Sequence, residues 1–121
     1  MSWITLLMFL TIAVFALSKA LPAKGVKSIT TEDLAKDLSL QVKKQYIDVR
    51  SEVEYNDRHI PQFSNIPLYL LKQRVNELDK KKPVVIICHS GMRSISAAKT
   101  LKKLGFKQIE NVSSGINAWK D

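Results

Sequence analysis

Cys88, the only cysteine of the chain, opens a short loop that ends near a permanent cation, Arg93. The loop and its flank read Cys88-His89-Ser90-Gly91-Met92-Arg93-Ser94. A loop that opens a helix presents N–H groups without intrahelical partners, and it lies at the positive end of the helix dipole. Such a setting favours the thiolate form of a cysteine. The sequence therefore predicts a nucleophile that can carry negative charge on sulfur.

The segments on either side of this loop predict how it is positioned. Residues 84–87 are four consecutive β-branched residues, which is typical of a strand buried on both faces in a parallel sheet. Apolar residues from 94 to 104 recur at helical spacing, and Gly105 ends that pattern. We therefore expect a strand, a tight loop and a helix, with Cys88 at the start of the loop.

The rest of the chain alternates between strand and helix patterns. We expect a short strand at Ile29, a helix capped by Thr30 that runs through Leu38, and a helix capped by Ser51 that runs to about Arg58. The other predicted elements are strands over 45–49, 65–66 and 108–112 and helices over 68–78 and 114–119. This alternation predicts an α/β domain with a central parallel sheet flanked by helices.

The N-terminal segment is apolar. Residues 3–17 carry no charge, and the stretch 1–21, interrupted only by Lys19, approaches the ~20 residues that span a bilayer. Lysines follow this stretch and none precedes it, which favours an uncleaved single-pass anchor with the remaining chain in the cytoplasm. A cleaved signal peptide and a buried helix are the alternatives. We expect an anchor over 1–21, a linker over 22–27 and one domain over 28–121.

Composition limits the classes of partner. The formal net charge is +8, but the lysines are dispersed and no aromatic residues alternate with them, so nucleic acid is not the expected partner. Solvated helix faces and a nearby anionic membrane account for the charge. One cysteine rules out an intramolecular disulfide, and one cysteine with two histidines shows no metal-ligand spacing. We expect no metal and no cofactor.

Several short motifs, taken in order, resemble a single-domain rhodanese, a sulfurtransferase family, over about residues 26–119. The matching residues are 46–50, 54–55, 59–61, 65–68, 88–94, 97–98, 101, 104–106 and 114–119. The chain departs from the family pattern at two places. Arg58 and Gln62-Phe63 replace glycine and Gly-Ala around the histidine motif, and Ser113-Ser114-Gly115 replaces a double glycine.

The resemblance implies both a fold and a reaction. The fold is a central parallel sheet flanked by helices. The reaction is transfer of sulfane sulfur, in which Cys88 cycles between a thiolate and a persulfide. A small anionic donor such as thiosulfate supplies the sulfur, and cyanide or a thiol accepts it; a protein acceptor is left open. The residues implied to bind substrate or shape the loop are His89, Ser90, Gly91, Met92, Arg93 and Ser94.

Asp48 and Arg50 are the supporting candidates outside the loop. They follow a predicted strand, at the sheet edge where α/β proteins form their sites. The resemblance implies that Asp48 lies at the rim of the pocket. The spacing of Arg50 and Glu54 indicates a salt bridge that braces this corner, and a purely structural role for the pair remains an alternative.

Loop length separates the rival enzyme classes. Four residues lie between Cys88 and Arg93. Phosphatases of related fold place one more residue between their cysteine and arginine, which makes room for a phosphate. The shorter loop favours transfer of a single sulfur atom. A phosphatase or arsenate reductase and a non-catalytic, membrane-tethered interaction module remain as alternative functions.

Overall fold

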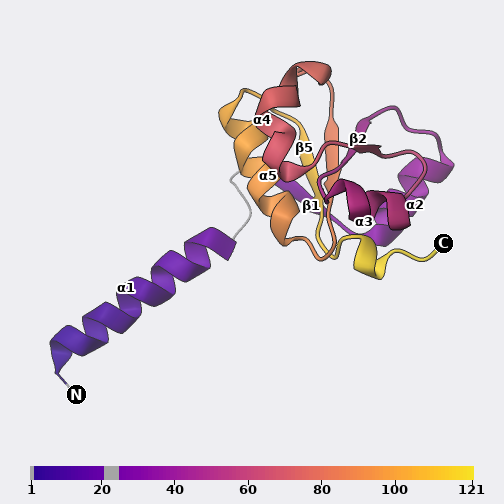
Figure 1. Cartoon of the computed structure of the whole chain (residues 1–121). Coiled ribbons are helices and arrows are strands. Elements are labelled where there is room, and N and C mark those ends of the chain that lie inside the picture. Colours follow the sequence, from indigo (N-terminus) through magenta and orange to yellow (C-terminus); the bar gives the residue numbers. More distant parts are fainter. Residues whose placement is uncertain (1, 21–24) are drawn as a thin grey trace.

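A parallel β-sheet forms the centre of the structure, which is a computed structural model that describes residues 2–20 and 25–121 (Figure 1). Within these residues the sheet has five strands in the order β1-β5-β4-β2-β3, and every neighbouring pair is parallel. In chain order the strands are β1 (Val26–Ile29), β2 (Gln45–Asp48), β3 (Ser64–Asn65), β4 (Val84–Ile87) and β5 (Ile109–Val112). The predicted α/β fold with a central parallel sheet is confirmed.

Helices cover both faces of this sheet (Figure 1). On one face, α4 (Leu71–Arg74) and α5 (Met92–Lys103) pack against the sheet, and Leu71, Ala97 and Leu101 belong to the buried cluster there. On the other face, α2 (Thr31–Ser39) contributes Leu34 to a second cluster. A further helix, α3 (Glu52–Asp57), follows β2. The sheet is therefore enclosed on both sides, as its uniformly apolar central strand requires.

The central strand β4 is buried along its whole length, and all four of its side chains are 0% exposed. Val84 and Ile86 join the cluster that contains α5, whereas Val85 and Ile87 join the cluster that contains α2. Successive side chains of a strand point to opposite faces, so a strand covered on both faces needs apolar residues throughout. The β-branched run predicted this strand correctly.

The direction of the chain connections reverses between β2 and β4. The chain leaves β2 toward β3 on one side of the sheet, and it leaves β4 through α5 toward β5 on the other side. Adjacent strands whose connections diverge in this way form a topological switch point, where α/β proteins bind ligands. The two strand ends stay in register, since the Val49 N–H donates to the Ile87 carbonyl at 3.0 Å. Cys88 follows directly, so the predicted nucleophile lies at this switch point.

Both predicted helix caps are present, and each forms a capping box. Thr30 accepts a hydrogen bond from the Asp33 N–H, and the Asp33 carboxylate accepts one from the Thr30 N–H. Ser51 and Glu54 form the same reciprocal pair at the start of α3. Each box satisfies donors that would otherwise lack partners in the first helical turn. The starts of α2 and α3 were therefore predictable from local sequence.

Two predicted helices are wrong in form. Residues 68–78 do not make one helix but the succession η1 (Leu68–Leu70), α4 and η2 (Val75–Glu77), in which only α4 is α-helical. Val75 and Asn76 are weak helix formers, so intrinsic propensity does not extend α4 beyond Arg74. The predicted final helix is reduced to the 3-10 turn η3 (Ile116–Ala118).

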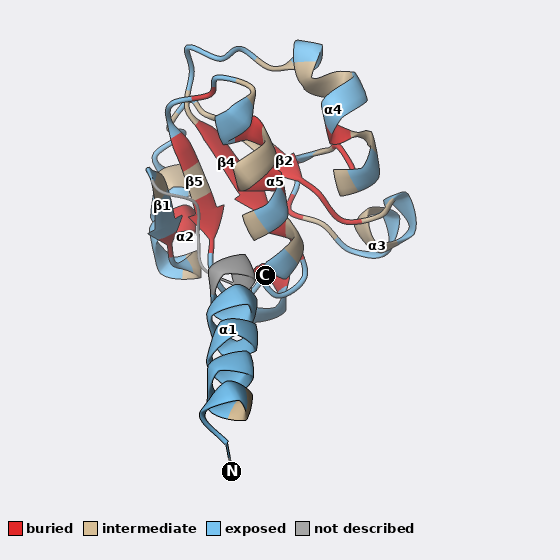
Figure 2. Ribbon diagram, turned by 90° about the vertical axis from the view of Figure 1, so that its left-hand side faces the viewer, coloured by how far each residue is buried: buried red, intermediate tan, exposed pale blue. Residues whose placement is uncertain are grey.

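The N-terminal segment forms a helix, α1 (Trp3–Ala20), and its apolar residues between 3 and 17 are exposed (Figure 2). Within the described residues, however, no helix is long and apolar enough to cross a membrane, and the predicted transmembrane anchor is not supported. The uncharged run ends before Lys19, short of the ~20 residues that a span needs. Residues 22–24, half of the predicted linker over 22–27, lie outside the described residues, and the division into domains stays a prediction.

Candidate active site

The sulfur of Cys88 accepts hydrogen bonds from two main-chain N–H groups. Cys88 follows β4 and is only 1% exposed. Its Sγ lies 3.0 Å from the Gly91 nitrogen and 3.3 Å from the Ser94 nitrogen. As a thiol, Cys88 also donates to the Ser94 hydroxyl at 3.4 Å. Fixed N–H donors aimed at a sulfur atom stabilise negative charge there without further rearrangement.

Gly91 has a backbone conformation that other residues rarely adopt. Its φ is 99°, and a Cβ atom at this position would lie 2.2 Å from the carbonyl oxygen of Ser113. The positive φ and the close backbone approach both require glycine at this position. The Gly91 carbonyl accepts the Ile95 N–H at 3.2 Å and the Ser94 hydroxyl at 2.9 Å, which ties the loop to the first turn of α5.

The C-terminal segment holds the loop from the other side. The Ile116 N–H donates to the Cys88 carbonyl, and the Asn117 N–H donates to the His89 carbonyl at 3.0 Å. Sequence reasoning did not find these contacts. The motif over 114–119 is part of the family resemblance. Hydrogen bonds between main-chain atoms do not depend on residue type, so the sequence does not predict which segments they join.

Arg93 is paired with a carboxylate on α3. Its Nη1 and Nη2 donate to the two carboxylate oxygens of Glu54 at 2.6 and 2.8 Å. The bonds from Arg93, joined by those from Ser51, lower the pKa of Glu54 from 4.5 to about 2. The same contact raises the pKa of the Arg93 guanidinium, and Cys88 and Asp48 add smaller effects in the same direction. Glu54 therefore lies beside the loop as a fixed negative charge.

The predicted salt bridge between Arg50 and Glu54 is wrong. Arg50 instead pairs with Asp48, which its Nη2 contacts at 2.8 Å and its Nε at 3.0 and 3.1 Å. The same Nη2 reaches the Arg58 carbonyl at 2.6 Å. Local spacing suggested Glu54 as the partner, but Glu54 is taken by Arg93 from a segment 39 residues away.

Asp48 is 0% exposed and Arg50 is 4% exposed, so the carboxylate does not lie at a pocket rim. A buried carboxylate needs such a partner because desolvation of an isolated charge is costly. The side-chain amide of Asn65 adds to this ion pair by donating hydrogen bonds to the main-chain carbonyls of Asp48 and Arg50 at 2.9 and 3.0 Å. This corner positions the start of α3, and thereby Glu54.

The remaining loop residues lie on the outside. His89, Ser90 and Met92 are exposed, whereas Ser94 is buried beside the sulfur. The structure thus brings Gly91 and Ser94 into contact with the Cys88 sulfur, pairs Arg93 with Glu54 and leaves the other three residues exposed; their functional roles stay predictions. Among the described residues, no group of three or more His, Cys, Asp or Glu side chains could hold a metal ion.

Comparison with known proteins identifies a single family. The model of the rhodanese-like domain matches residues 30–121, which is most of the chain. YrkF of Bacillus subtilis is 39% identical over 97 residues, which cover 80% of this chain and 52% of YrkF. A protein named sulfurtransferase from Allochromatium vinosum is 33% identical over 94 residues, which cover 78% of this chain and 88% of that protein. The chain therefore spans about half of YrkF but most of the second relative.

A solved structure supports the same relationship. The crystal structure of a rhodanese-like domain protein from Staphylococcus aureus superposes with a TM-score of 0.73 at 33% identity. The match covers 78% of this chain and 92% of that protein. The α/β domain described above is therefore shared nearly in full.

Proposed function

Because this chain belongs to the rhodanese-like domain family, we propose that it is a sulfurtransferase that carries sulfane sulfur as a persulfide on Cys88. Thiosulfate, a small anion, is the reference donor for this reaction. The acceptor is a thiophile such as cyanide or a thiol. The convergence of the Gly91 and Ser94 N–H groups on the Cys88 sulfur, at 3.0 and 3.3 Å, is the observation that carries the proposal.

The first half-reaction loads the enzyme. The Cys88 thiolate attacks the outer sulfur of thiosulfate, a new S–S bond forms, and the S–S bond of the donor breaks. Sulfite leaves with the bonding electron pair, so charge and atoms balance without an oxidant or a proton. The loop N–H groups stabilise the negative charge, which begins on the thiolate and ends on the terminal sulfur of the persulfide.

The second half-reaction unloads the enzyme. Cyanide attacks the terminal sulfur, thiocyanate forms, and the electron pair of the Cys88 persulfide bond returns to the thiolate. The Cys88 and His89 carbonyls bind to the C-terminal segment, so the same N–H groups remain in place through both steps. Preorganised donors of this kind lower a barrier because they need not rearrange during the reaction.

Intact-mass measurement tests the proposal directly. The full chain is incubated with thiosulfate, and its intact mass is then measured by mass spectrometry. The variant Cys88→Ser serves as the matched control. We expect a gain of one sulfur atom in the wild type only, and its removal by cyanide with release of thiocyanate.

Two other results would assign a different function. Hydrolysis of an aryl phosphate without any sulfur adduct would indicate a phosphatase. Inertness toward thiosulfate, organic persulfides and aryl phosphate alike would indicate a non-catalytic interaction module.

A further inference from the structure

Arg93 does not present a free positive charge to the loop, because Glu54 occupies both of its terminal nitrogens. The two N–O distances are 2.6 and 2.8 Å, the geometry of a paired, two-point contact. An anion that approaches Cys88 therefore meets an ion pair that is neutral overall rather than a cation.

The carboxylate is held in place independently of Arg93. Glu54 Oε1 accepts the Ser51 N–H at 3.3 Å and the Ser51 hydroxyl at 3.0 Å, which closes the capping box of α3. This arrangement fixes Glu54 to its own helix. With a pKa of about 2, Glu54 stays ionised at neutral pH. If Arg93 turned toward a bound anion, an unpaired carboxylate would remain beside the site.

We propose that Glu54 is a specificity-determining residue that disfavours multiply charged inorganic donors and favours organic persulfides. The inference rests on the proposed sulfurtransfer and names the donor class. Thiosulfate is a dianion, so it would have to compete with Glu54 for Arg93 or bind next to a negative charge. A persulfide presents one charge at most at the transferred sulfur, and the Gly91 and Ser94 N–H groups suffice for it.

The transfer from such a donor is balanced. The Cys88 thiolate attacks the terminal sulfur of R–S–SH, the S–S bond of the donor breaks, and the thiolate R–S⁻ leaves. The proton stays on the transferred sulfur, and the resulting Cys88 persulfide then ionises. No step requires Arg93 to release Glu54.

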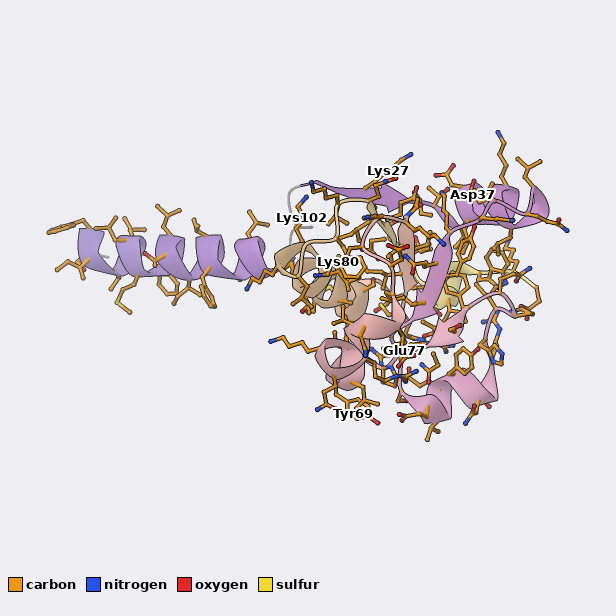
Figure 3. The ribbon with its side chains drawn as sticks, turned by 90° about the horizontal axis from the view of Figure 1, so that it is seen from above. Lys27, Asp37, Tyr69, Glu77, Lys80 and Lys102 are labelled. Atoms are coloured by element: carbon orange, nitrogen blue, oxygen red, sulfur yellow. The ribbon has the colours of Figure 1, made fainter. Side chains whose placement is uncertain are left out.

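The variant Glu54→Gln removes the negative charge of Glu54 but keeps the helix cap, because the amide oxygen of glutamine can still accept hydrogen bonds from Ser51. Glu52→Gln is the matched control on the same helix. Glu52 accepts the Tyr69 hydroxyl at 2.6 Å, and Tyr69 lies at the edge of the domain (Figure 3). Glu54→Asp keeps the charge and controls for a change of shape.

Alkylation of Cys88 measures the local charge without any sulfur transfer. The rate with anionic iodoacetate is divided by the rate with neutral iodoacetamide. We expect Glu54→Gln to raise this ratio by about tenfold, since a partly exposed charge near the sulfur is only partly screened. Glu52→Gln and Glu54→Asp should keep the wild-type ratio. An unchanged or lower ratio in Glu54→Gln would overturn the proposal.

Donor kinetics then test selectivity. We expect Glu54→Gln to lower the KM for thiosulfate by about tenfold with little change in kcat, while constants for glutathione persulfide stay within about twofold. A higher KM for thiosulfate would show that Glu54 instead orients Arg93 toward the donor. If the wild type accepts sulfur from neither donor, the proposed function fails, and the alkylation ratio still decides the role of Glu54.

Discussion

The N–H of Ile116 donates a hydrogen bond to the carbonyl of Cys88 at 2.8 Å, so Cys88 is held from outside its own loop. The next residue, Asn117, binds the carbonyl of His89 in the same way. With these two carbonyls bound to η3, the N–H groups of Gly91 and Ser94 are left to bind the sulfur. The electrostatics at Cys88 therefore depend on the C-terminal segment.

Gly115→Ala should disturb this arrangement. Gly115 has φ 64° and ψ −169°, and a Cβ atom there would lie 2.5 Å from the carbonyl oxygens of both Cys88 and His89. We expect a loss of about 1–3 kcal/mol in the free energy of unfolding from the backbone conformation alone. We also expect slower persulfide formation, because the two carbonyls must move. Urea denaturation and the mass of the thiosulfate-treated protein measure the two effects.

The control for this prediction is Ser114→Gly, which restores the double glycine that the family pattern has at this point. Ser114 is exposed, so its replacement should change stability by no more than about 0.5 kcal/mol. Equal effects of the two substitutions, or a Gly115→Ala protein that loads sulfur at the wild-type rate, would contradict the role assigned to this contact.

Asp48→Asn should be strongly destabilising. The substitution leaves the guanidinium of Arg50 buried without its charged partner, and breaking a buried pair from one side costs about 3–5 kcal/mol. The midpoint and slope of urea unfolding report the loss. Glu77→Gln is the control, because Glu77 pairs with Arg74 near the surface and such pairs contribute about 0–1 kcal/mol. Similar losses in both variants would mean that the Asp48–Arg50 pair is not a structural brace.

The sequence predicted those parts of the fold that local patterns determine. Strand β4 follows from its β-branched run, and the starts of α2 and α3 follow from the caps at Thr30 and Ser51. Hydrophobic spacing alone was less reliable. The apolar pattern over 68–78 indicated one helix, but the chain there forms η1, α4 and η2, of which only α4 is α-helical.

The contacts that define the candidate site were harder to predict because they depend on topology. Arg50 lies four residues before Glu54, whereas Arg93 lies 39 residues after it, so local spacing favoured the wrong partner. Only the strand order, which places the ends of β2 and β4 side by side, brings Glu54 to Arg93. The position of Cys88 between β4 and α5 could be predicted from sequence, but the pairing of Glu54 with Arg93 could not.

Acid should destabilise the wild type more steeply than Glu54→Gln. The pKa of Glu54 is about 2 in the folded chain against an ordinary value of 4.5, so its contribution is complete above pH 4.5. As the pH falls from 4.5 through 2, the unfolded chain takes up a proton that the folded chain does not, and that contribution is lost. The side chain is 36% exposed, so screening reduces the effect.

Chemical unfolding at a series of pH values between 5 and 2.5 tests this expectation. The two stability curves should converge toward the acid end, with the wild type losing more. Parallel curves over the whole range would show that the Arg93–Glu54 pair adds no pH-dependent stability.

Arg58→Gly should loosen the C-terminal segment. Arg58 stands where the family pattern has glycine, and its side chain reaches the Trp119 carbonyl at 2.8 Å, the Ile116 carbonyl at 3.4 Å and Asp121 at 3.2 Å. Because these contacts are largely exposed, we expect a loss of about 1 kcal/mol in the free energy of unfolding. Hydrogen exchange of the Ile116 amide should quicken, since that amide holds the Cys88 carbonyl. Arg58→Lys should restore part of the protection; unchanged exchange in Arg58→Gly would mean that the segment holds the loop without help from Arg58.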